Sequence, residues 1–94
     1  MNKYETIIIL SKEGSKEERD RVLEKIKTYI EENGEITKNE DMGLKKFAYE
    51  IRKQKEGYYY LIEFMSIPSN IRELERIYRI TDEILKFIVV KLEN

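Results

Sequence analysis

Cationic and aromatic side chains are concentrated in one stretch of the sequence, KKFAYEIRKQKEGYYY, residues 45–60. Five of these sixteen residues are Lys or Arg, four are Tyr and two are Glu, whereas the whole chain has a formal net charge of -1. Residues 13–41, by contrast, hold ten acids and six bases. Cationic side chains contact phosphates, and aromatic rings stack on unpaired bases. The stretch is therefore a candidate nucleic-acid site in a polarised molecule.

The candidates within this stretch are Lys45, Lys46, Arg52, Lys53 and Lys55 for phosphates, and Tyr49, Tyr58 and Tyr59 for stacking. Each type also has a structural explanation. Tyr60 is best explained by strand propensity and core packing, and lysines on an edge strand prevent aggregation. Each phosphate contact adds ~0.7–0.9 to the slope of log K against log salt, and each stacked base contributes ~1–3 kcal/mol to binding. With four or five lysines and one Tyr, the chain alone should bind RNA weakly.

Catalytic chemistry has little support in the sequence. The chain contains no Cys and no His, so thiol chemistry, the usual general base and the commonest neutral metal ligand are missing. It also lacks a glycine-rich phosphate loop and a nucleophile paired with a base. Adjacent acids such as Glu17 and Glu18 do not share a helix face and typically coat a solvated surface. We expect a non-enzymatic protein with no metal, no cofactor and no small-molecule substrate.

The length of 94 residues, with 40% hydrophobic and 39% charged residues, predicts one domain over residues 1–94. No apolar run approaches the ~18 residues of a membrane span, and the start does not resemble a signal peptide. We therefore expect a cytoplasmic protein with no membrane partner.

Six predicted elements alternate along the chain. Strands are expected at residues 4–10, 35–49, 58–65 and 85–92, with residues 52–57 as a loop, and Met42-Gly43 is expected to form a bulge in a polar edge strand. The first helix should start at the capping box of Ser15 and Glu18 and stop near Gly34. Pro68 should open the second helix, which should end near residues 81–82.

The order strand, helix, strand, strand, helix, strand is the split βαβ, or ferredoxin-like, α+β fold. It places both helices on one face of a four-stranded antiparallel sheet. Strand alternation assigns Tyr60, Ile62, Phe64, Leu85, Phe87 and Val89 to the helix side. The opposite, uncovered face should carry Ile7, Ile9, Tyr59, Leu61, Ile88 and Val90. A patch of this size is typical of a surface that a partner protein covers, although self-association or draped Lys and Glu side chains would also explain it.

Three segments give the chain a resemblance to a known family: KYETIIIL at the start, MGLKKFAYEIRK followed by GYYYLIEF in the centre, and ELERIYRITDEILKFIVVKL at the end. In this order they resemble the bacterial small-subunit ribosomal protein S-six family. The resemblance implies a ferredoxin-like fold and a place in the small ribosomal subunit. It also implies a heterodimer with the small basic ribosomal protein S-eighteen, which binds the central domain of the small-subunit ribosomal RNA.

Residues that match the family's basic and aromatic positions become the RNA-facing candidates: Lys3, Tyr4, Lys45, Lys46, Tyr49, Lys86 and Lys91, with Arg52 and Lys53 next. Glu50 is a departure, because it stands where many members of the family have Pro.

Three other readings share this architecture. An RNA-recognition motif would need aromatic residues on its first strand, where Ile7 and Ile9 stand instead. A ligand-sensing regulatory domain would form a homodimer through its sheet. An acylphosphatase-like enzyme would need a glycine-rich anion loop.

Overall fold

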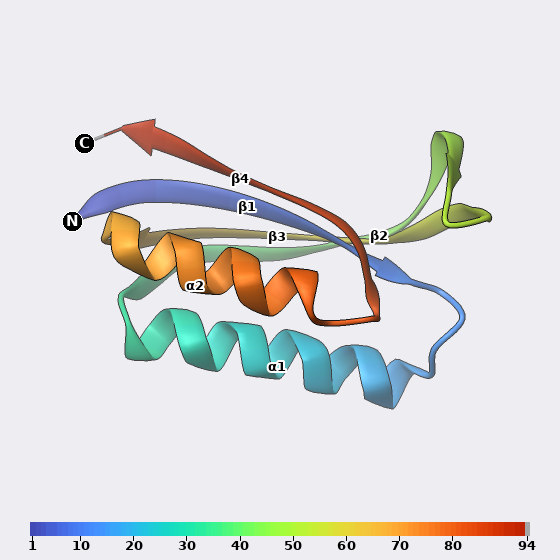
Figure 1. The fold of residues 1–94 in the computed structure, drawn as a ribbon, viewed down its shortest axis with the longest axis horizontal. Coiled ribbons are helices and arrows are strands. Elements are labelled where there is room, and N and C mark those ends of the chain that lie inside the picture. The colour runs from blue at the N-terminus through green and yellow to red at the C-terminus, as the bar shows by residue number, and fades with distance from the viewer. Residues whose placement is uncertain (94) are drawn as a thin grey trace.

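The computed structural model describes residues 1–93, with four strands and two helices. In chain order these are β1 (Asn2–Ser11), α1 (Lys16–Glu32), β2 (Glu35–Ile51), β3 (Gln54–Ser66), α2 (Pro68–Arg79) and β4 (Ile84–Glu93). The strands form one antiparallel sheet in the order β2-β3-β1-β4, and both helices cover the same face (Figure 1). The predicted ferredoxin-like fold is confirmed. We call the face without helices the outer face.

Alternation along β1 places its two faces as predicted. Tyr4, Thr6, Ile8 and Leu10 are at most 6% exposed and face the helices, which contribute Ile26, Ile30, Leu74 and Tyr78 to the same core. The buried Thr6 hydroxyl donates to the carbonyl of Ile88 at 2.9 Å and also contacts the Tyr78 hydroxyl at 3.2 Å. Its polar group is therefore satisfied inside an apolar core.

The first helix begins at the predicted cap. The Ser15 hydroxyl oxygen accepts from the backbone N–H of Glu18 at 3.1 Å, and the hydroxyl donates to the Glu18 carboxylate at 3.3 Å. The helix stops near Gly34 as predicted: it ends at Glu32 and Asn33 is its C-cap, although Gly34 has no positive φ. A Cβ at Gly34 would lie 2.0 Å from the Met65 carbonyl oxygen. Gly34 is needed because two backbone segments meet there.

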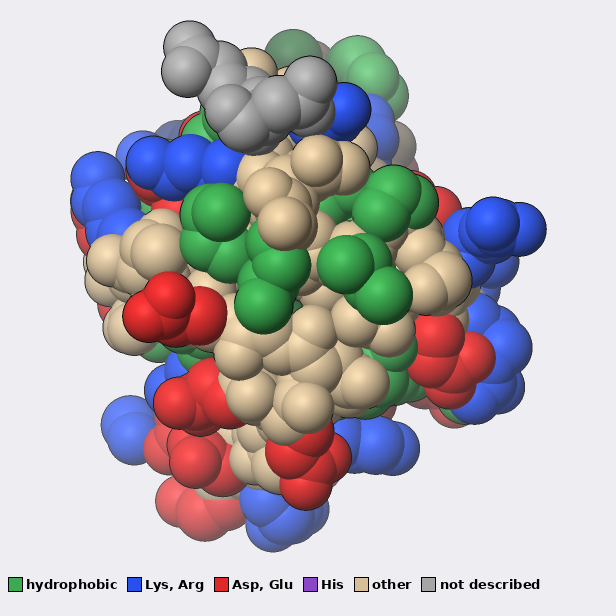
Figure 2. Space-filling view, turned by 90° about the vertical axis from the view of Figure 1, so that its left-hand side faces the viewer, with side chains coloured by type: hydrophobic (Ala, Val, Ile, Leu, Met, Phe, Trp, Pro, Cys, Tyr) green, Lys and Arg blue, Asp and Glu red, His purple; other side chains and the backbone are tan. Residues whose placement is uncertain are grey.

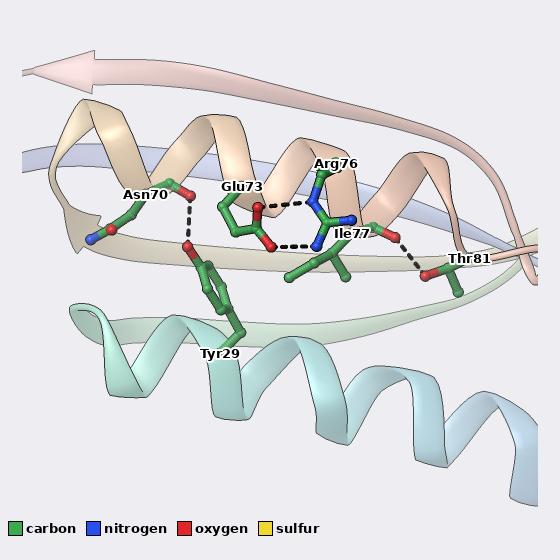
Figure 3. Close-up of polar contacts among 6 residues, drawn as sticks. All are labelled: Tyr29, Asn70, Glu73, Arg76, Ile77 and Thr81. Carbon is green, nitrogen blue, oxygen red and sulfur yellow. Dashed lines mark hydrogen bonds and ion pairs between the residues drawn. The ribbon is translucent and has the colours of Figure 1, made fainter.

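Polar contacts join the two helices to each other and to the end of β3. The Tyr29 hydroxyl donates to the carbonyl of Asn70 at 3.1 Å, bridging α1 and α2 (Figure 3). The carbonyl of Asn33 accepts from Ser66 and from the Asn70 amide, both at 2.9 Å. Pro68 opens α2 as predicted, and the helix ends at Arg79. The Thr81 hydroxyl then donates to the carbonyl of Ile77 at 2.6 Å (Figure 3).

The edge strand β2 is longer than predicted and is irregular. The expected bulge lies between Asp41 and Gly43, where Gly43 adopts a φ of 79°. The expected loop over residues 52–57 is wrong, because Ile51 already pairs with Gln54. Only two residues, Arg52 and Lys53, form the turn, with φ values of 50° and 64°. Positive φ at both positions is typical of a two-residue hairpin turn.

A bulge at the start of β4 changes one predicted core position. The pairing with β1 shifts between Ile9 and Leu10, so that Leu10 lies opposite Ile84. Ile84 therefore joins the core cluster in place of Leu85, which is buried outside that cluster. Phe87 and Val89 pack against the core as predicted.

Candidate RNA and protein interface

The tip of the β2–β3 hairpin bends away from the helices, toward the outer face (Figure 1). Lys46 pairs with Glu56 and Ile51 pairs with Gln54, so residues 47–50 of β2 lie opposite Lys55 alone. The extra residues leave the ladder and bring Phe47 next to Tyr59, with ring centroids 6.2 Å apart. An insertion of this kind bends a strand and redirects its side chains. The hairpin tip thus covers part of the sheet that strand alternation predicts to be uncovered.

Gly57 allows this close packing. A Cβ built on Gly57 would lie 2.9 Å from the Leu10 carbonyl oxygen, 2.9 Å from the Phe47 ring and 3.0 Å from the Ile9 side chain. A side chain at this position would displace the Phe47 ring or the neighbouring strand. Gly57, in the sequence EGYYY, therefore leaves room for the Phe47 ring of the bent hairpin.

An open groove of about 330 Å³ lies between the bent hairpin and the outer face. We call it the hairpin groove. Its residues come from β1, the hairpin tip, β3 and β4: Ile7, Ile9, Lys46, Phe47, Ala48, Tyr49, Ile51, Tyr59, Lys86, Phe87 and Ile88. Lys46 and Lys86 are its charged residues, and both are exposed. The groove therefore joins an apolar surface to cationic side chains.

Most of the predicted RNA-facing residues lie at the hairpin end of the molecule. Within the described residues, the ion pairs involve none of Lys45, Lys46 and Lys86. Tyr49 is 71% exposed at the tip. Arg52 is partly engaged, because its guanidinium donates to the carbonyl of Asp82 at 3.2 Å. The structure brings Lys46, Tyr49 and Lys86 together in the groove, and places Lys45, Arg52 and Lys53 elsewhere along the same hairpin.

The other predicted RNA-facing residues lie near the opposite end of the sheet. Lys3 is six residues from Ile9 along β1, and Ile9 pairs with Lys86. At about 3.3 Å per residue, Lys3 lies about 20 Å from the hairpin group. Lys91 pairs with Tyr4 at this same end. A short RNA segment therefore cannot contact both groups of residues at once.

Two predicted site residues are largely buried within the chain. The Tyr4 ring is 6% exposed and stacks on Phe64 in the core, so it cannot serve as a platform for a base. Ile9 does point to the outer face, but it is 7% exposed because the hairpin tip lies close to it. Tyr58 is also engaged, since the Arg19 guanidinium lies 4.0 Å from its ring centroid.

The remaining residues of the predicted partner face stay accessible. Ile7, Tyr59 and Leu61 are half-buried, while Ile88 and Val90 are 49% and 45% exposed. The sequence reasoning missed Phe47 as a member of this surface, because nothing in the local pattern KKFAYE marks residues 47–50 as leaving the strand ladder. The outer face is therefore smaller and more aromatic at the hairpin end than predicted.

Further exposed apolar residues lie at the end of the molecule where β1 begins and β4 ends. Figure 2 shows hydrophobic side chains there with acidic and basic side chains around them. Met1, Ile67 and Leu92 are the large apolar residues exposed in these segments. Such single exposures are usual on protein surfaces and do not define a site. Among the described residues, neither helix is long and apolar enough to cross a membrane.

Comparisons with known proteins agree on one family. A family model described as "Ribosomal protein S6" matches residues 3–91. The small ribosomal subunit proteins bS6 of Caldanaerobacter subterraneus and Thermoanaerobacter pseudethanolicus are 44% and 45% identical to this chain over the full length of both proteins. A crystal structure of 30S ribosomal protein S6 from Thermotoga maritima superposes with a TM-score of 0.92 at 41% identity, covering 97% of this chain and 87% of the other.

Proposed function

Because the chain belongs to the ribosomal protein S-six family of the small ribosomal subunit, we propose that it binds the central domain of the small-subunit ribosomal RNA together with ribosomal protein S-eighteen. It acts as one domain, residues 1–94, with a structural and not an enzymatic role. As a component of the ribosome it is a cytoplasmic protein.

The observation that supports this proposal is that cationic and apolar surfaces adjoin at the hairpin end. Lys46 and Lys86 line the same groove as Ile7 and Ile88. Cations that carry no intramolecular ion pair are available for phosphates, and the apolar residues beside them are available for a protein. A protein pair bound to RNA would use both surfaces.

The proposed RNA contacts follow the geometry. Lys45, Lys46, Tyr49, Arg52, Lys53 and Lys86 form the main group at the hairpin end. Lys3 and Lys91 form a second group about 20 Å away, in which Lys3 lies 3.8 Å from the Glu63 carboxylate. RNA must therefore extend along the molecule to reach both groups. The Tyr4 ring is not part of either.

The proposed contact with S-eighteen uses the outer face. Ile7, Tyr59, Leu61, Ile88 and Val90 supply the accessible apolar surface. Complete burial of one such side chain is worth ~1.5–3 kcal/mol, so even partial burial of five supports an association after its entropy cost. S-eighteen is small and basic, so it would add the positive charge that this nearly neutral chain lacks.

A ligand-sensing domain that forms a homodimer is not favoured by the family to which the chain belongs. The two functions predict different oligomeric states for the isolated chain. The homodimer reading requires the outer faces of two copies to cover each other, whereas the proposal leaves this face free until S-eighteen is added.

The test is a titration of a labelled central-domain ribosomal RNA fragment with this protein, with S-eighteen, and with both, at two salt concentrations. The proposal expects tight, salt-dependent binding only when both proteins are present. A Val90→Asp variant places a carboxylate on the outer face and leaves every proposed RNA contact intact. With this variant, addition of S-eighteen should no longer increase the affinity for the RNA fragment. Absence of binding by the pair, together with a stable homodimer of this chain, would refute the proposal.

A further inference from the structure

The hairpin groove has walls of the kind that accept a flat aromatic group. Phe47 and Tyr59 lie at one side with their ring planes inclined by 48°. Ile7 and Ile88 come from the neighbouring strands β1 and β4. Nucleic-acid bases stack on aromatic side chains largely irrespective of sequence, because every base has a π face. The walls therefore fit a base that is not paired.

The charged residues of the groove are of one sign. Lys46 comes from the hairpin tip and Lys86 from β4, and no Asp or Glu is among the lining residues. Both ammonium groups belong to exposed residues that make no ion pair in the described structure. An occupant with negative charge at its edge is therefore favoured over a basic peptide.

The size of the groove limits the occupant further. At about 330 Å³ it lies at the lower end of the range for small-ligand pockets. This volume suits one base with its sugar, and it is small for a helix or a folded segment. Tyr49, exposed at the tip, is available to a neighbouring base.

We propose that the hairpin groove holds one unpaired nucleotide of the bound RNA, with its base against Phe47 and Tyr59 and its flanking phosphates on Lys46 and Lys86. This inference rests on the proposed function, which it makes more specific. It narrows the protein contact proposed above to Leu61, Ile88 and Val90, because Ile7 and Tyr59 then line the nucleotide site at the hairpin end. Ile88 lies at the boundary between the two.

The test uses the full chain alone and two single-stranded RNA hexamers, one ordinary and one abasic with the same phosphates. Methyl NMR signals of Ile7, Ile9 and Ile88 report on the groove. The ordinary hexamer is expected to shift all three signals, and the abasic hexamer is expected to shift mainly that of Ile9, which lies opposite Lys86. Equal shifts from both hexamers, or no shift at millimolar concentration, would overturn the inference.

Two variants separate stacking from general effects. Phe47→Leu keeps an apolar side chain and removes the ring, so it should weaken binding of the ordinary hexamer about 5-fold or more without changing binding of the abasic hexamer. Ile80→Ala, at an exposed apolar residue just after α2 that belongs to no proposed contact, should change neither. Thermal unfolding of both variants checks that the fold is kept. Unchanged hexamer binding by the Phe47→Leu variant would also overturn the inference.

The titration of the ribosomal RNA fragment with the protein pair is read separately. If the pair binds the fragment while the hexamers do not distinguish base from phosphate, only the nucleotide site is wrong. If the hexamers occupy the groove while the pair does not bind the fragment, the proposed function is wrong and the groove remains a nucleotide site.

Discussion

Replacing Gly34 by alanine tests the packing argument most directly. The new methyl group would lie 2.0 Å from the Met65 carbonyl oxygen, and Met65 pairs with both Lys3 and Glu35 in the sheet. The contact is with backbone, so rotation of a flexible side chain cannot relieve it. The segment before β2 must move away from β3.

The cost follows from the contacts that this movement breaks. The carbonyl of Asn33, one residue earlier, accepts hydrogen bonds from Ser66 and Asn70. Losing two such bonds costs ~1–3 kcal/mol, and disturbance of the adjacent ladder adds to it. We expect a loss of about 2–4 kcal/mol in the free energy of unfolding, since strain and broken buried networks lie in the upper part of the range for single substitutions.

Urea and thermal unfolding followed by circular dichroism measure this loss. For a domain of this length, each 1 kcal/mol lowers Tm by roughly 4–8 °C, so a decrease of roughly 8–32 °C is expected. The matched control is Gly14→Ala, because the nearest atom to its Cβ is the Glu18 carboxylate oxygen at 3.5 Å, an ordinary contact. If the two variants unfold at the same temperature, close backbone contact does not explain Gly34.

Three further predictions concern charge, pH and capping. Lys45→Gln with Lys46→Gln should lower the slope of log K against log salt for RNA binding by the protein pair by about 1.4, because each phosphate contact on a single strand contributes roughly 0.7. Unfolding should not change, since both residues are exposed, and an unchanged slope would remove them from the site. Burial raises the pKa of Tyr78 above its ordinary value of 10.0, so its contribution to stability is complete below pH 10 and is lost as the pH rises further. Urea unfolding between pH 9 and 11 should show this decline, and a Tyr78→Phe variant with the same decline would contradict it. Ser15→Ala should cost ~1 kcal/mol through loss of the cap, whereas Ser15→Asp, which keeps an acceptor, should cost little; equal losses in urea unfolding would argue against the cap.

Strand alternation predicted the faces of β1 and β3 because a period of two is imposed by the backbone. The polar residues Glu5 and Glu63 alternate with the core positions, and the same alternation from Ile7 and Ile9 places Tyr4 and Thr6 on the helix side. The family resemblance instead suggested Tyr4 as an RNA contact. The structure agrees with the alternation for the Tyr4 ring.

The bent hairpin could not be predicted in the same way. Arg52 and Lys53 form a turn with positive φ although neither is the Gly or Asn usual in such turns. Residues 47–50 leave the ladder where Phe47 of β2 packs against Gly57 and Tyr59 of β3, across the turn of the hairpin. The hairpin groove depends on these tertiary contacts, so local patterns could not reveal it.

The position of β1 in the sheet has a consequence for synthesis of the protein. β1 is translated before every other element, yet it lies between β3 and β4, and β4 is translated last. Until β4 emerges, one side of the apolar strand TIIIL has unpaired N–H and C=O groups, which is the hazard of an exposed edge. Folding must therefore be completed after the ribosome has made β4. A chain stalled before that point would carry an open strand edge next to a core that lacks Ile84 and has no Phe87 or Val89 packed against it, and this is the form of the protein that would aggregate or be degraded.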